Sequence, residues 1–208
     1  MYFTERLNSI THLAGAVASL IGLGALVTVG IYEQKLLLFV GFLTFGLALV
    51  MLYVFSTLYH SFRNPRTKSV FQKLDHIAIY LLIAGSYTPF TLVTLIDSSG
   101  IYMLIAVWSL AFVGIGLDLF IKTRIELIQI TIYLIMGWLI VIDFSNLKEL
   151  LPPPGLLWLT IGGLTYTIGI IFYILDHKGL MKHSHGIWHL FVLAGSVSHF
   201  IAVIGYVR

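Results

Sequence analysis

The chain has 208 residues, of which 59% are hydrophobic and only 10% are charged. Soluble domains are typically about 25% charged, so this composition, with a mean hydropathy of +0.98, excludes a soluble globular fold and intrinsic disorder. The sequence contains no cysteine, which excludes disulfides, iron–sulfur clusters and thiolate metal sites. The net charge of +3 is scattered among long apolar runs, so we expect no nucleic-acid partner.

Seven stretches are long and apolar enough to cross a hydrocarbon core of ~30 Å as helices. In chain order they are residues 7–31, 36–59, 74–96, 101–121, 125–144, 155–175 and 185–207. Open strands would leave backbone groups unpaired in lipid, and the runs lack the alternation of a membrane barrel. The sequence therefore predicts an all-α membrane protein, a single seven-transmembrane helix bundle over residues 1–208, in which Pro89 kinks the third span.

Basic residues are unequally shared between the two ends of this predicted bundle. Nine precede the first span or lie in the connections on its side, and three lie on the opposite side. Cytoplasmic loops carry the excess of lysine and arginine, so we expect a cytoplasmic N-terminus and an outer C-terminus in the cell inner (plasma) membrane. The nine are Arg6, Arg63, Arg66, Lys68, Lys73, Lys122, Arg124, Lys178 and Lys182, and the three are Lys35, Lys148 and Arg208.

A few polar side chains fall at matching ends of the predicted spans. They are Ser56 and His60 at the end of the second span, Asp75 at the start of the third, and His185 and His189 at the start of the seventh. Even-numbered spans end where odd-numbered spans begin, so all five share one depth near the cytoplasmic side. Ionisable groups inside a membrane are costly and mark functional sites, and residues four apart share a helix face.

Three imidazoles with a carboxylate and no sulfur are typical of a catalytic zinc site. We therefore expect zinc on His60, His185 and His189, with Asp75 as a direct fourth ligand or as the general base that holds a zinc-bound water. Ser56 is expected to donate a hydrogen bond to a substrate carbonyl or its oxyanion, rather than to act as the nucleophile. The same ligands also suit iron, manganese or nickel.

Two further histidines lie within predicted spans. His12 is a turn and a half inside the first span, where it serves either as a partner of the zinc ligands or in a buried hydrogen bond. His199 is about 21 Å from His185 along a helix, too far to share the ion. It faces within about 40° of the same direction, so we expect it to line the same interior deeper in the bundle.

At these residues the sequence resembles the hemolysin III family, the bacterial branch of the progestin and adiponectin receptor superfamily. The matching segments are ERLNSITH (5–12), STLYH (56–60), KLDHIAIY (73–80), AGSYTP (84–89) and HGIWH (185–189), followed by His199. The resemblance implies seven transmembrane helices with the N-terminus inside. It also implies zinc on His60, His185 and His189, with Asp75 at the zinc-bound water and Ser56 alongside.

Two functions follow as hypotheses. The first is a membrane hydrolase of lipid amides or esters, because the resemblance implies the ceramide-like activity attributed to the receptors and to alkaline ceramidases. Its substrate and partners would be membrane lipids. The alternative is a receptor-like, cytolytic or membrane-homeostasis protein in which the metal is structural, since bacterial members carry the hemolysin name for a reported cytolytic effect.

Overall fold

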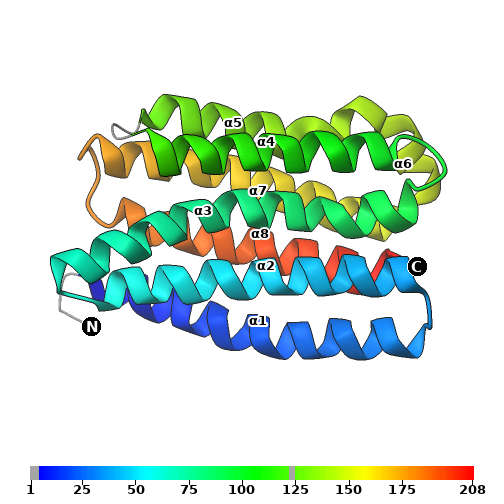
Figure 1. Ribbon diagram of the computed structural model, residues 1–208, viewed down its shortest axis with the longest axis horizontal. Helices are drawn as coiled ribbons and strands as arrows, with labels where there is room; N and C mark the ends of the chain where they lie inside the picture. The colour runs from blue at the N-terminus through cyan, green and yellow to red at the C-terminus, as the bar shows by residue number, and fades with distance from the viewer. Residues whose placement is uncertain (1–4, 122–124) are drawn as a thin grey trace.

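A computed structural model describes residues 5–121 and 125–208, and all regular secondary structure in these ranges is helical. The helices lie side by side along one axis, with the two ends of the chain at opposite ends of the bundle (Figure 1). They are α1 (Arg6–Tyr32), α2 (Leu36–Ser61), α3 (Pro65–Pro89), η2 (Phe90–Thr94), α4 (Gly100–Phe120), α5 (Glu126–Trp138), η3 (Leu139–Asp143), α6 (Phe144–Leu150), α7 (Pro153–His177) and α8 (Ser184–Tyr206).

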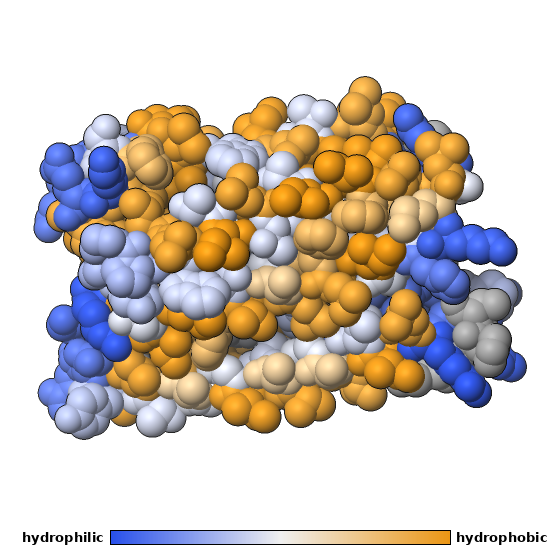
Figure 2. Space-filling model, turned by 180° about the vertical axis from the view of Figure 1, so that it is seen from behind, coloured by the Kyte–Doolittle hydropathy of each residue, from blue (hydrophilic) through white to orange (hydrophobic). Residues whose placement is uncertain are grey.

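Within the described residues, seven helical segments are long and apolar enough to cross a membrane. On the face shown in Figure 2, hydrophobic residues cover the middle of the molecule and hydrophilic residues gather at both ends. The predicted seven-span helical bundle is thus confirmed, and the chain is a multi-pass membrane protein. The side of the membrane that each end faces stays a prediction, and Lys122 and Arg124 lie outside the described residues.

Five of the predicted spans agree with the helices to within two residues at each end, and the third does not. The helix of the third span begins at Pro65, well before the predicted start at Leu74. Asn64 caps it, because its side chain accepts the backbone N–H groups of Arg66 and Thr67 at 3.0 and 3.4 Å. The first turns of α3 are polar, so a prediction based on apolar length omitted them.

The fifth span also departs from prediction, because it continues to Leu150 through a short 3-10 turn, η3. The hydroxyl of Tyr87, from α3, donates to the Gly137 carbonyl at 2.9 Å and accepts the Ile140 N–H at 2.9 Å. A side chain inserted into the helical ladder in this way interrupts it. In the third span, the helix passes Pro89 into the π-helical turn η2.

The third span is the most enclosed of the seven. Ala78, Tyr80 and Ala84 of α3 are fully buried. By contrast, α4, α5 and α7 turn most of their large apolar side chains outward, as expected for helices that face lipid. The candidate site lies beside α3, at the end of the bundle where α2 ends and α8 begins.

Candidate metal centre

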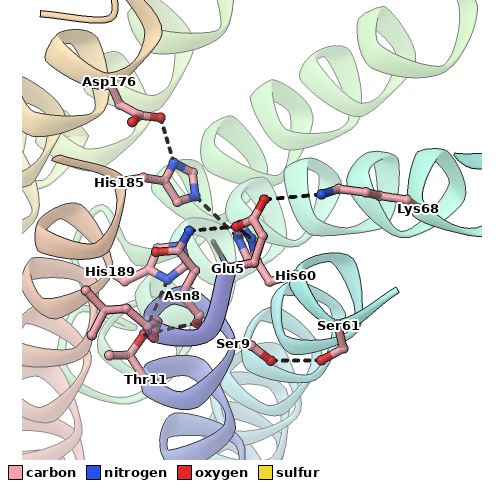
Figure 3. Close-up of polar contacts among 11 residues, drawn as sticks. Glu5, Asn8, Ser9, Thr11, His60, Ser61, Lys68, Asp176, His185 and His189 are labelled. Carbon is pink, nitrogen blue, oxygen red and sulfur yellow. Dashed lines mark hydrogen bonds and ion pairs between the residues drawn. The ribbon is translucent and has the colours of Figure 1, made fainter. Parts of the chain in front are cut away.

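Three histidines converge at this end of the bundle. His60 is in the last turn of α2, and His185 and His189 occupy the first two turns of α8. One ligand nitrogen from each lies within 4.8 Å of the other two, and the Nε2 atoms of His60 and His185 are 3.3 Å apart. The close-up in Figure 3 shows the three rings meeting between the two helices. The structure thus brings together the three predicted ligands.

Two of the three histidine rings make a hydrogen bond to a carboxylate through Nδ1. Glu5 accepts a hydrogen bond from His60 Nδ1 at 2.8 Å, and Asp176 accepts one from His185 Nδ1 at 2.9 Å (Figure 3). A carboxylate oxygen can only accept, so each Nδ1 carries the proton and each Nε2 keeps its lone pair. Metal-binding histidines are oriented by acceptors in the same way, which fixes the tautomer and raises the basicity of the ligand.

His189 follows the same pattern with a weaker partner. Its Nδ1 is 3.5 Å from the hydroxyl of Thr11, which itself donates to the backbone carbonyls of Leu7 and Asn8. The hydroxyl therefore accepts from the ring. His189 Nε2 is buried and has no hydrogen-bond partner among the described residues. A buried nitrogen with an unused lone pair costs free energy unless another group binds it.

Glu5 also connects three helices near the centre. Besides His60 on α2, its carboxylate accepts from Asn8 on α1 at 2.8 Å and from Lys68 on α3 at 3.2 Å. Burial raises the pKa of Glu5, but the hydrogen bonds from His60, Asn8 and Lys68 outweigh burial and lower the pKa to about 2. The group is therefore a permanent anion behind a metal ligand.

His12 contacts the centre by stacking. Its ring lies 3.6 Å from the ring of His189, with an angle of 17° between the planes. Neither ring nitrogen of His12 makes a hydrogen bond within the described part of the chain. Of the two predicted roles, contact with a zinc ligand fits this geometry, and the stacked ring restrains the plane of His189.

Ser56 and Asp75 are both buried near this end of the bundle but are not part of the group of three ligand atoms. Ser56 lies one turn before His60 on α2, and its hydroxyl has no hydrogen-bond partner among the described residues. Asp75 lies in α3 and lines a cavity together with His12. Their predicted roles in catalysis stay predictions.

The cavity lies between α3, α5, α7 and α8 and has a volume of about 130 Å³. Its lining is mainly leucine, isoleucine and aromatic side chains. Along α3 it extends from Asp75 to Ser86 and Tyr87, which is about 16 Å at the helical rise. His199 lines it as well, as predicted from the helical spacing. An elongated apolar cavity therefore runs into the bundle from Asp75 and His12, and His12 stacks on the candidate ligand His189.

Sequence reasoning did not assign the partners of the histidine rings. Glu5, Thr11 and Asp176 act through hydrogen bonds to Nδ1, and none was predicted to take part. A signal for two of them was present. Acidic residues number only nine in the chain, and Glu5 and Asp176 flank predicted spans at the same end as the histidines.

The donor set fits a divalent metal. One nitrogen of each imidazole lies within 4.8 Å of the other two, the Nδ1 atoms of His60 and His185 face carboxylates, and the Nε2 atom of His189 has no hydrogen-bond partner among the described residues. Three protein nitrogens leave at least one coordination position open, which is the arrangement of catalytic rather than structural zinc sites.

The fold and this centre define a class of protein: a seven-helix membrane protein with a buried three-histidine centre at one end of the bundle. The profile of the family described as "Haemolysin-III related" matches residues 1–200. The chain belongs to this family, as its resemblance predicted.

Individual relatives agree with this assignment. The chain is 40% identical to hemolysin-3 of Bacillus cereus over 203 residues, which are 98% of this chain and 91% of the relative. It is 41% identical to the hemolysin-3 homolog of Bacillus subtilis (strain 168) over 202 residues, 97% and 93% of the two chains. It is also 29% identical over 170 residues to the human monocyte to macrophage differentiation factor, covering 78% of this chain and 68% of that protein.

Proposed function

We propose that the protein is a zinc-dependent membrane hydrolase that cleaves an amide or ester bond of a membrane lipid. The observation that carries the proposal is the set of three histidines whose Nδ1 atoms are held by acceptors, next to an elongated apolar cavity. A purely structural site normally surrounds zinc with four protein ligands, whereas this group contains three.

Zinc bound by these histidines supplies a Lewis acid that lowers the pKa of water and polarises a carbonyl. The hydroxyl of Ser56 has no other hydrogen-bond partner among the described residues, so it is available to donate to the carbonyl oxygen as charge develops there. Asp75, which lines the cavity together with His12, would take the proton of the attacking water and return it to the leaving nitrogen or oxygen as the C–N or C–O bond breaks.

The cavity supports a lipid as the substrate. Its wall is apolar, and Trp138, one of its lining residues, is 43% exposed on the outer surface of the bundle. Its indole N–H donates to the hydroxyl of Thr167 on α7 at 3.2 Å. Trp138 and Thr167 therefore lie where the cavity wall meets the lipid-facing surface, and we propose that a chain enters from the bilayer between α5 and α7. We place the protein in the inner membrane, with membrane lipids as its partners.

The test is hydrolysis by purified, zinc-loaded protein of a panel of N-acyl amides and acyl esters in detergent. We expect turnover by the wild type, and a loss of at least ~100-fold in His189→Ala and Asp75→Asn. Asp75→Asn should retain zinc by elemental analysis. His177→Ala, an exposed histidine at the end of α7, is the matched control and should keep full turnover. Wild-type protein that retains zinc and hydrolyses none of the panel contradicts the proposal.

A second candidate is a structural metal in a receptor-like or cytolytic protein. It is favoured by the location of the ligands, because the metal would connect α2 to α8. Two relatives carry the name hemolysin-3 or hemolysin-3 homolog. In this case, chelation would lower the melting temperature while no hydrolysis is found, and release of dye from liposomes would depend on the metal.

A further inference from the structure

His199 is an unusual residue in the deep half of the cavity. It lies on α8, ten residues beyond the metal ligand His189, and is only 8% exposed. Neither of its ring nitrogens makes a hydrogen bond within the described residues, although the ring lines the cavity. An imidazole that is buried among apolar side chains with no partner is costly, so a ligand is expected to supply one.

The other polar side chains at this depth are already satisfied. Three of them bond to backbone carbonyls: Ser86 to Ile83 at 2.8 Å, Tyr87 to Gly137 at 2.9 Å and Thr167 to Gly163 at 2.8 Å. The other two bond to hydroxyls: Tyr166 with Ser196 at 2.8 Å and Trp138 to Thr167 at 3.2 Å. These groups already use their protons, so they can accept but not donate, and His199 alone among these side chains makes no hydrogen bond to any residue that the structure describes.

The packing of the ring shows which capacity remains. A Cβ atom on Gly162 would overlap the Cδ2–Nε2 edge of His199, so this edge lies against the backbone of α7. The Leu159 carbonyl, one turn earlier on α7, is near the ring but does not meet the distance and angle criteria of a hydrogen bond. The edge with Nδ1 is turned away from α7. We assign the proton of the neutral ring to Nε2, on the α7 side near the Leu159 carbonyl, which leaves Nδ1 as the acceptor.

We propose that this end of the cavity binds a hydroxyl group on the chain of the lipid, which donates a hydrogen bond to His199. The inference rests on the proposed function in one respect, namely that a lipid chain occupies the cavity. An acceptor nitrogen needs a donor, so a hydroxyl fits and a ketone does not. The preferred lipid thus has one polar group at the metal centre and a second one deep in the bundle.

The position of the hydroxyl follows from the helix. Ten residues separate His189 from His199, which is about 15 Å along α8 at the helical rise. An extended hydrocarbon chain covers this length in about twelve carbons, given C–C bonds of about 1.5 Å. A hydroxyl near carbon 12 therefore reaches His199, whereas one at carbon 2 stays at the metal centre.

The test is competition binding with the full-length protein in phosphatidylcholine nanodiscs, using radiolabelled stearate as the probe. Unlabelled 12-hydroxystearate, 12-oxostearate, 2-hydroxystearate and stearate are the competitors. One added hydrogen bond corresponds to about five- to tenfold in affinity. We expect 12-hydroxystearate to bind this much more tightly than the other three. Equal affinity for the 12-hydroxy, 12-oxo and unsubstituted acids overturns the proposal, and this comparison requires no variant.

Two variants sharpen the result. In His199→Phe the preference for 12-hydroxystearate should disappear while the affinity for stearate stays within about twofold. Val192→Ala enlarges the same wall without touching a polar group, so it should change the affinities for both acids by the same factor. A preference that survives in His199→Phe contradicts the proposal.

The outcomes for binding and for hydrolysis are separable, because fatty acids cannot be hydrolysed further. A protein that prefers the 12-hydroxy acid but hydrolyses no lipid refutes the proposed hydrolase and keeps the hydroxyl site. A protein that hydrolyses lipid amides but shows no preference for the 12-hydroxy acid supports the proposed hydrolase and refutes the hydroxyl site.

Discussion

The Nε2 atoms of His60 and His185 lie 3.3 Å apart, although 125 residues separate the two histidines in the chain. Each ring donates its Nδ1 proton to a carboxylate, so the two facing nitrogens both carry lone pairs. Two lone pairs repel each other unless a metal ion or a proton lies between the two nitrogens. Two nitrogens bound at 2.0–2.1 Å to a tetrahedral zinc are ~3.3–3.4 Å apart. The spacing of the pair is therefore compatible with two ligands of one tetrahedral metal ion.

Glu5→Gln should weaken metal binding by about 10- to 100-fold, because a neutral amide makes the His60 ring a poorer donor to the metal. Competition with a chromogenic chelator measures the affinity. Glu33→Gln is the matched control, since Glu33 caps the far end of α1 and should leave the affinity unchanged. Equal metal affinities for the wild type and Glu5→Gln would show that Glu5 does not support metal binding.

Asp176→Asn should also weaken metal binding, by a similar factor. One oxygen of Asp176 accepts from His185 and the other from the hydroxyl of Ser184 at 3.2 Å, so the substitution also loosens the start of α8. The same titration reports the affinity. Asp97→Asn, between the third and fourth spans, provides the comparison, and a change of equal size in that variant would count against a local effect.

Chelation should lower the melting temperature of the wild type but not that of His189→Ala. A metal that binds only the folded state stabilises it by about 2.7 kcal/mol when present at 100 times its Kd. Thermal unfolding in detergent, with and without a chelator, measures the difference. If chelation lowers both melting temperatures equally, the metal that is removed was bound elsewhere.

Gly162→Ala should destabilise the protein by about 1–3 kcal/mol, the usual cost of overpacking a filled interior. The new methyl group would overlap the His199 ring. Gly163→Ala, the next residue, meets nothing within 4 Å and should be neutral or stabilising by up to about 1 kcal/mol through helix propensity. Melting temperatures of the two variants provide the comparison, and identical values would contradict the packing of His199 on α7.

Tyr87→Phe should destabilise the fifth span by about 1–3 kcal/mol, because it leaves the Ile140 N–H and the Gly137 carbonyl without their partner. Tyr102→Phe removes a hydroxyl from a side chain that is 78% exposed and should have little effect. Hydrogen exchange at Ile140 reports the local change. Unchanged protection there would show that η3 does not depend on the tyrosine.

The helices could be predicted because lipid imposes a length and an apolar composition on each span. The predicted span boundaries were wrong where a helix cap or a contact from another helix, rather than apolar length, sets the end of a helix. Asn64 and Pro65 start α3 among polar residues, which apolar length does not detect. The hydroxyl of Tyr87 interrupts the fifth span from another helix, and no local pattern in residues 125–144 shows that contact.

The group of three histidines could be predicted because spacing and depth are properties of the chain. His185 and His189 share a helix face, and His60 lies at the same depth once the spans are known. Their partners could not be predicted in the same way. Glu5 and Asp176 reach the rings through side-chain directions and loop paths, which arise only when the helices pack.

The amino-acid sequence alone was sufficient for the class of protein, the seven spans and the three histidines, because the membrane leaves few places for a polar residue and each exception is informative. Packing was needed to show that Nε2 of His60 and of His185 faces the centre, that His12 stacks on His189, and that His199 lines a cavity with no hydrogen-bond partner in the described part of the chain. These are relations between side chains of different helices, and they depend on rotation and approach within a few ångströms. The hydropathy of the sequence does not predict distances between side chains of different helices.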